Sequence, residues 1–187
     1  MNVRVVKATS ELIDARLQTG DAVRFTVPTW SMYPALAPGD CVIVRRARAA
    51  EPRVGDLIIV KPDASAAWIV HRLIARRESE GATRIVTKGD NCSAADPPWL
   101  ETRLIGRVVA VQRQRAAQPI DFTSRRARVA SAGLALLSRG QAFVEAKTRG
   151  KCPDKDPSLT RRGALKVSRW VTRASGFAAR WIIGWGV

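Results

Sequence analysis

Three residues of this 187-residue chain, Ser31, His71 and Asp96, have the side-chain types that nucleophilic catalysis requires. Ser31 lies in the stretch "VPTWSMYPALAPGD" (27–40), between two bulky residues and ahead of two prolines and a Gly-Asp turn. A loop stiffened in this way can hold a hydroxyl group in one place. His71, the single histidine, can act as the base that deprotonates it, and Asp96 can orient that base. The residue types alone prove little, because most proteins of this size contain all three and a lone histidine is more often structural.

The elements that must position these residues begin with a short helix and a series of short strands. The stretch "ATSELIDARLQTG" (8–20) is typical of a helix that Thr9 or Ser10 caps and Gly20 ends. Runs rich in Val and Ile, bounded by Gly, Pro and Asp, then predict six strands, at residues 22–27, 41–46, 56–60, 68–77, 83–89 and 104–111. Short strands with irregular spacing predict a mainly β fold, built as a compact antiparallel domain.

The pattern changes near Gln118, where Ala, Arg, Leu and Lys replace the β-like runs. Residues 125–147 predict one helix, weakened by Gly133 and Gly140. Residues 164–185 predict a second helix, whose apolar residues recur at helical spacing on one face. We therefore divide the chain into an N-terminal helix (1–20), a β domain that carries the candidate residues (21–118) and a basic helical C-terminal region (119–187).

The charge of the chain is strongly positive and concentrated towards its C-terminal end. The net charge is +16, and residues 119–187 hold 14 Lys and Arg against 4 Asp and Glu, a net +10. Such a field favours anionic partners, either acidic lipid or nucleic acid. The aromatic residues of 164–185 lie on the apolar face rather than among the arginines, which suits packing on the domain or lying in a lipid headgroup layer better than binding nucleic acid. We therefore expect an anionic membrane surface as a partner of the C-terminal helix, and we predict no particular oligomeric state.

Nothing in the sequence predicts a metal, a cofactor or a membrane-spanning segment. Cys41, Cys92 and Cys152 are widely spaced and form no CxxC pair, so we expect three free thiols, without a metal site or a disulfide. No apolar run reaches the roughly 18 residues that span a bilayer, and the N-terminus lacks the apolar core of a secretory signal. We therefore expect a peripheral membrane or cytoplasmic protein.

Several short stretches, taken in order, resemble the conserved boxes of the signal peptidase I family of serine peptidases. "SMYPALAPGD" (31–40) resembles the nucleophile box, and "VGDLIIV" (54–60) resembles the strand that follows it. Most bacterial members have a lysine base before the arginine of the third box, whereas this chain has His71-Arg72, as in the endoplasmic-reticulum and archaeal branch. "TKGDN" (87–91) resembles the fourth box of that branch, and "LIGRVVAV" (104–111) resembles the strand that closes the domain.

This resemblance implies a role for each candidate residue. It makes Ser31 the nucleophile, His71 the general base and Asp96, six residues after Asp90, the acid that orients the base. Asp90 is the second candidate for that acid, or a turn residue. The backbone N–H of Ser31 and the hydroxyl of Thr29 would form the oxyanion hole. The implied substrate is a peptide or preprotein from which a signal or leader peptide is cut, and the resemblance implies no metal or cofactor.

The chain departs from the family pattern in two places. Trp30 stands before the nucleophile where the family usually has glycine, so a large ring could narrow the cleft and change the preference for small residues before the cut. We also do not expect the N-terminal transmembrane anchor of the family. In its place we expect a short helix before the domain and the basic helical region after it.

Two other functions fit part of the sequence. The self-cleaving repressor peptidases share the fold but use a lysine base, and neither Lys61 nor Lys88 occupies the position that His71 holds. The alternative from another class is a non-enzymatic nucleic-acid- or membrane-binding protein on a degenerate peptidase fold. Binding to anionic vesicles but not to RNA would distinguish the membrane from the nucleic-acid form of that alternative.

Overall fold

The protein is built around one antiparallel β-sheet, described by a computed structural model that covers residues 13, 15–62, 68–79, 81–114 and 116–145. The strands follow the order β1-β2-β7-β3-β4-β5-β6, β8 pairs with β7, and every pairing is antiparallel. Their bounds are β1 Val23–Thr26, β2 Cys41–Arg46, β3 Leu57–Val60, β4 Ile69–Ser79, β5 Ala82–Lys88, β6 Trp99–Leu100, β7 Leu104–Gln112 and β8 Ile120–Asp121. The predicted mainly β, antiparallel fold is therefore confirmed.

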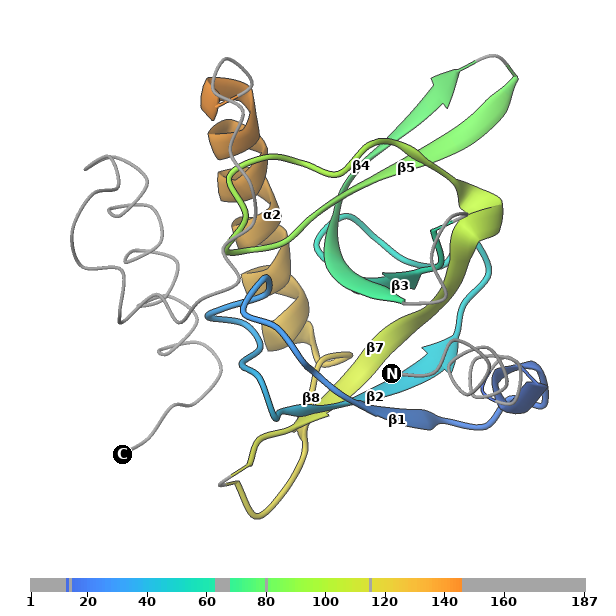
Figure 1. The fold of residues 1–187 in the computed structure, drawn as a ribbon, viewed down its shortest axis with the longest axis vertical. Helices are drawn as coiled ribbons and strands as arrows, with labels where there is room; N and C mark the ends of the chain where they lie inside the picture. The colour runs from blue at the N-terminus through green and yellow to red at the C-terminus, as the bar shows by residue number, and fades with distance from the viewer. Residues whose placement is uncertain (1–12, 14, 63–67, 80, 115, 146–187) are drawn as a thin grey trace.

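The sheet curls, so that the β1–β2 end and the long β4–β5 hairpin point in different directions (Figure 1). All six predicted strands are present, each shifted by no more than a few residues. The two strands that the sequence did not predict, β6 and β8, have two residues each. Such strands are too short to show the alternation of apolar and polar residues by which a strand is recognised.

The central strand β3 is buried on both of its faces. Leu57 and Ile59 pack into a first core cluster with residues of β2, β7 and the β1–β2 loop. Ile58 and Val60 point the other way, into a second core cluster with Leu73 of β4 and Ile85 of β5. Successive residues of a strand face opposite sides, so a strand with apolar cover on both sides has no polar alternation. This explains the continuous run "LIIV".

The N-terminal helix is described only at residue 13 and residues 15–18, and it packs on the first core cluster. Leu17 is fully buried there and Ile13 is partly buried. Gly20, with φ of 86°, follows the last helical turn, in the left-handed conformation that glycine adopts at little cost. The predicted caps Thr9 and Ser10 lie outside the described residues.

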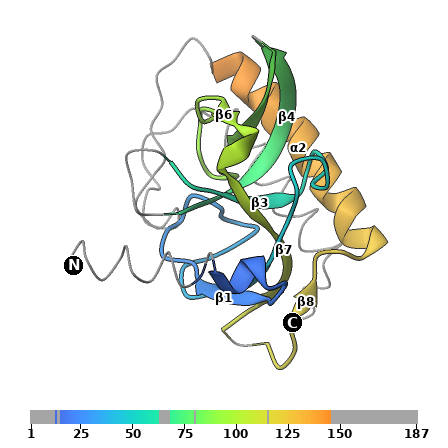
Figure 2. The same ribbon diagram turned by 90° about the vertical axis from the view of Figure 1, so that its right-hand side faces the viewer.

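Helix α2 (Arg125–Glu145) follows β8 and runs along the sheet beside β4 (Figure 2). Ser124 caps it, because its Oγ accepts a hydrogen bond from Ala127 N at 3.3 Å. The helix continues through Gly133 and Gly140, as the sequence predicts for residues 125–147. The second predicted helix, 164–185, lies outside the described residues. In the described part of the chain, no helix combines the length and the apolar character needed to cross a bilayer.

Gly55 sets how closely α2 approaches the sheet. A Cβ atom at this position would lie 2.8 Å from backbone atoms of Ser131 and Ala132, and Gly55 has a φ of 104°. Both the space and the backbone conformation therefore exclude a side chain.

We predict that Gly55→Ala lowers the free energy of unfolding by several kcal/mol, because the left-handed conformation costs an alanine about 1–2 kcal/mol and the helix must also move. Gly81→Ala is the matched control, since Gly81 has a φ of 73° and open space around it. Urea unfolding of both variants measures the difference. Equal losses would show that α2 does not press on Gly55.

Candidate active site

The loop that carries Ser31 joins β1 to β2 and is closed at its base by backbone hydrogen bonds. Val27 N donates to Asp40 O at 2.8 Å, and Gly39 N donates to Val27 O at 2.8 Å. Met32, directly after the serine, is 1% exposed and belongs to the first core cluster. Because its neighbour is anchored in the core, the half-buried Ser31 is held at a fixed place on the core surface.

Arg113, just beyond β7, holds the far side of the same loop. Its guanidinium group pairs with the carboxylate of Asp40 and donates to Ala35 O at 2.8 Å. The Asp40 carboxylate also accepts a hydrogen bond from Ala37 N at 2.9 Å. The Gly-Asp turn (39–40) therefore closes the loop, and its aspartate has a structural role as the partner of Arg113 and Ala37 N.

The turn after β5 binds the backbone on both sides of the serine. Asn91 N donates to Ser31 O at 2.8 Å, and Asn91 Nδ2 donates to Trp30 O at 3.1 Å. Cys92 N closes the turn by donating to Gly89 O at 3.0 Å. The stretch "TKGDN" thus fixes the position of the Ser31 loop.

His71, on β4, is buried and forms a short hydrogen bond with Asp96. Its Nδ1 lies 2.6 Å from Asp96 Oδ2. A carboxylate accepts, so Nδ1 carries the proton of this bond and Nε2 of the neutral ring is left with a free lone pair. Asp96 is itself tied back to β5, because its backbone N donates to Thr87 O at 2.8 Å.

Gly89 lies between Ser31 and His71. A Cβ atom on Gly89 would lie 2.7 Å from Ser31 O and 3.0 Å from His71 Nε2. The backbone of Ser31 and the free nitrogen of His71 therefore meet around one glycine. Among the described residues, the Ser31 hydroxyl is hydrogen-bonded to Thr29 Oγ1, at 3.2 Å, and not to His71. Hydrogen bonds between a nucleophile and its base often tighten only when substrate binds.

Asp90, the second candidate for the orienting acid, has a different partner. Its two oxygens accept hydrogen bonds from Arg72 Nε at 2.7 Å and Arg72 Nη2 at 2.6 Å. Arg72 is fully buried, and its Nη1 donates to Gly55 O at 2.7 Å. Asp90 therefore neutralises a buried guanidinium group, while the carboxylate that contacts His71 belongs to Asp96.

Trp30 lies beside the serine and faces Tyr33. The two rings meet edge to face, with centroids 5.5 Å apart. Trp30 O accepts a hydrogen bond from Tyr33 N at 3.1 Å, which tightens the turn around Ser31. The ring that replaces the family's usual glycine is thus held against its own loop.

The expectation of three free thiols is wrong for Cys92, which is disulfide-bonded, and Cys152 lies outside the described residues. Its sulfur lies 3.9 Å from Ser31 O, while Cys41 is a free thiol. Wide spacing along the chain did not exclude a disulfide, because only the separation of the two Cα atoms in the folded chain matters.

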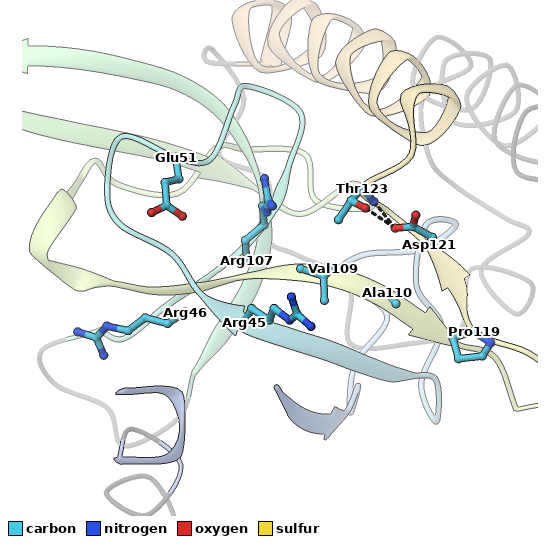
Figure 3. Close-up of a pocket in the computed structure, with 9 residues that line it drawn as sticks. All are labelled: Arg45, Arg46, Glu51, Arg107, Val109, Ala110, Pro119, Asp121 and Thr123. Carbon is cyan, nitrogen blue, oxygen red and sulfur yellow. Dashed lines mark hydrogen bonds between the residues drawn. The ribbon is translucent and has the colours of Figure 1, made fainter. Parts of the chain in front are cut away.

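A cavity of about 520 Å³ is lined mainly by residues of β2, β7 and the segment around β8, and neither Ser31 nor His71 is among its lining residues (Figure 3). Arg45, Arg46 and Arg107 line it together with two carboxylates. One of them, Asp121, accepts hydrogen bonds from the hydroxyl and the N–H of Thr123, and these lower its pKa below the usual value. Within the described residues no group of three or more His, Cys, Asp or Glu side chains could hold a metal ion.

Residues 12–115, more than half of the chain, match the family described as signal peptidase, peptidase S26. The chain belongs to this family. The match covers the whole of the sheet from β1 to β7, including the Ser31 loop, His71 and Asp96.

A curated relative of this signal peptidase family member is the signal peptidase complex catalytic subunit SEC11 of Eremothecium gossypii. The two are 39% identical over 67 residues, which make up 35% of this chain and 40% of the relative. The similarity therefore spans less than half of the relative's length. It supports the resemblance of this chain to the endoplasmic-reticulum branch of the family.

The sequence assigned no role to four residues that shape this site: Arg72, Thr87, Asn91 and Trp99. The first three lie in stretches that resemble family boxes, but no spacing rule says that an arginine in a strand is buried. Trp99 follows two prolines and reads as part of a loop. The hydrogen bonds of these residues join segments distant in sequence, so only the folded chain could identify them.

We predict that Asp90→Asn lowers the free energy of unfolding by about 3–5 kcal/mol, because it leaves the buried Arg72 without a counter-charge. Asp96→Asn is the matched control and should cost less, since the Asp96 side chain is 17% exposed and its partner His71 can stay neutral. Chemical unfolding of both variants measures the difference. A larger loss for Asp96→Asn would contradict the structural role of Asp90.

Proposed function

We propose that this signal peptidase family member is a serine endopeptidase that cleaves a signal or leader peptide from a precursor. In this proposal Ser31 is the nucleophile, His71 the general base and Asp96 the orienting acid. The observation that carries it is the 2.6 Å bond between His71 Nδ1 and Asp96 Oδ2. The opposite ring nitrogen, Nε2, and the backbone oxygen of Ser31 both lie within 3.0 Å of where a Cβ atom on Gly89 would be.

The reaction starts with proton transfer from Ser31 Oγ to His71 Nε2 as Oγ bonds to the substrate carbonyl carbon. The imidazolium that forms is stabilised by the Asp96 carboxylate, which also keeps the ring in the required tautomer. His71 then gives its proton to the leaving amine. Water attacks the acyl ester in the second half of the cycle, with His71 again as the base, and Ser31 regains its proton.

The negative oxygen of the tetrahedral intermediate needs hydrogen-bond donors, which we assign to the Ser31 N–H and the Thr29 hydroxyl. Thr29 Oγ1 lies 3.2 Å from Ser31 Oγ. It is therefore within reach of the oxyanion on the substrate carbon to which Ser31 Oγ bonds. Thr29 is exposed and its hydroxyl can turn towards a substrate.

A lysine base is less well supported. Lys88 is fully buried on β5, its Nζ lies 3.4 Å from Gly89 O, and it has further interactions of its own. Lys61 comes directly after the last residue of β3, Val60, whereas His71 pairs with Ile58 near the start of that strand. His71 is the base whose position and hydrogen bond suit the task.

We predict that Ser31→Ala and His71→Ala each lower kcat by roughly 10⁴-fold or more, and that the double variant is little worse, because the members of a triad act as a unit. Mass spectrometry of the products from a peptide library measures cleavage, and circular dichroism checks the fold. Lys61→Ala is the control and should stay active. Near-normal turnover of His71→Ala together with loss of turnover in Lys61→Ala would refute the histidine assignment.

We also propose that the basic C-terminal region brings the enzyme to an anionic membrane surface. The helix that the sequence predicts for 164–185 would combine an apolar face with Arg169, Arg173 and Arg180. Burial of the apolar face in the headgroup region and attraction of the arginines to anionic lipid both favour binding. This would place Ser31 near membrane-borne precursors.

We predict that replacing Arg169, Arg173 and Arg180 together with Glu weakens co-sedimentation with phosphatidylglycerol vesicles by on the order of 100-fold, since each basic residue near the surface contributes about 1 kcal/mol. Cleavage of a soluble peptide should stay unchanged. The triple Lys variant, which keeps the charge, is the control. Unchanged sedimentation of the Glu variant, or loss of its cleavage in solution, would contradict the anchoring role.

A further inference from the structure

The carboxylate of Asp96 accepts a second short hydrogen bond besides that of His71. Thr87 Oγ1 lies 2.6 Å from Asp96 Oδ2, the same oxygen that His71 Nδ1 contacts at 2.6 Å. Thr87 is fully buried in β5, where water cannot replace a lost partner. Hydrogen bonds to an ionised carboxylate are shorter and stronger than bonds between neutral groups, so this hydroxyl contributes directly to where the carboxylate sits.

The direction of the Thr87 hydrogen bond is determined by Trp99. The indole Nε1 of Trp99 lies 2.9 Å from Thr87 Oγ1. An indole N–H can only donate, so the Thr87 oxygen accepts from Trp99 and its single hydrogen is left to donate to Asp96. The result is a chain of two hydrogen bonds, from Trp99 to Thr87 and from Thr87 to Asp96. It ends at the Asp96 oxygen that also accepts the hydrogen bond from His71.

The far end of this chain is anchored in the protein core. Trp99 lies on β6, opposite Ile85 of β5, and packs against the second core cluster. Linked hydrogen bonds in a partly buried setting polarise and strengthen one another. The position of Asp96, which itself lies in a loop, is therefore tied through two side chains to the sheet that carries His71.

We propose that Thr87 and Trp99 are positioning residues that hold the Asp96 carboxylate against His71, and that turnover depends on the Thr87 hydroxyl. This inference rests on the proposed function of Ser31, His71 and Asp96. Neither residue touches the reacting atoms. They act by keeping the Asp96 carboxylate in place when His71 takes the proton of Ser31 and becomes positively charged.

The test compares three variants in the full chain. Thr87→Val keeps the shape of the side chain but removes the hydroxyl, and we expect kcat to fall by about 10- to 100-fold with KM changed by less than about threefold, as for the loss of one hydrogen bond to a charged group. Thr87→Ser restores the hydroxyl and should return kcat to within about threefold of wild type. Trp99→Phe removes the N–H donor together with one of the two fused rings and should lower kcat by a smaller factor than Thr87→Val.

A spectroscopic measurement separates positioning from a role in packing alone. The proton between His71 Nδ1 and Asp96 should give a downfield proton NMR signal that Thr87→Ser keeps and Thr87→Val shifts or broadens. Wild-type kcat in a folded Thr87→Val or Trp99→Phe variant overturns the inference, as does a Thr87→Ser variant as impaired as Thr87→Val. If Thr87→Val does not fold, Trp99→Phe decides the question by the same two readouts. Retained cleavage by Ser31→Ala would instead refute the proposed function itself.

Discussion

The guanidinium group of Arg72 is buried and must therefore find all of its partners inside the protein. It binds both oxygens of Asp90 and the backbone oxygen of Gly55. These contacts join three segments: β4, which carries His71; the turn after β5, which holds the Ser31 backbone through Asn91; and the Gly55 turn, on which α2 rests. A buried charge left without its partner is costly, so these segments keep their relative positions as long as the protein is folded.

An arginine suits this position because its planar fork binds a carboxylate through two parallel hydrogen bonds and still has a donor for a third partner. A lysine would offer a single ammonium group without that geometry. The pairing also separates the two carboxylates that follow β5. Asp90 pairs with Arg72, and Asp96 is left to face His71, with the Thr87 hydroxyl donating to the same oxygen.

The two core clusters position different parts of the candidate site. The first holds Met32 and therefore the Ser31 loop, and the second holds the strands and the tryptophan behind His71 and Asp96. The turn at Gly89 lies close to both the Ser31 backbone and the His71 ring, and a residue with a side chain would not fit there. In our proposal the nucleophile and its base come from separately packed parts of the sheet, and the buried Arg72 pair keeps these parts in register.

The sequence by itself determined the kind of fold and the candidate residues. Turn residues between Val- and Ile-rich runs predicted all six of the longer strands, because strand periodicity and turn chemistry are local properties. The family resemblance implied Asp96 as the acid beside His71 and left Asp90 as the second candidate, whereas local spacing alone could not choose between the two. Asp90 and Asp96 lie six residues apart in one loop, and the choice depends on the pairing of β4 with β5, which places Arg72 opposite Lys88 and brings Asp90 to Arg72. The tertiary structure also decided the two-residue strands, the disulfide state of Cys92 and the chain from Trp99 through Thr87 to Asp96. Each of these features depends on contacts between separate segments of the chain or on the direction of a buried side chain. Local spacing in the sequence encodes neither such contacts nor such directions.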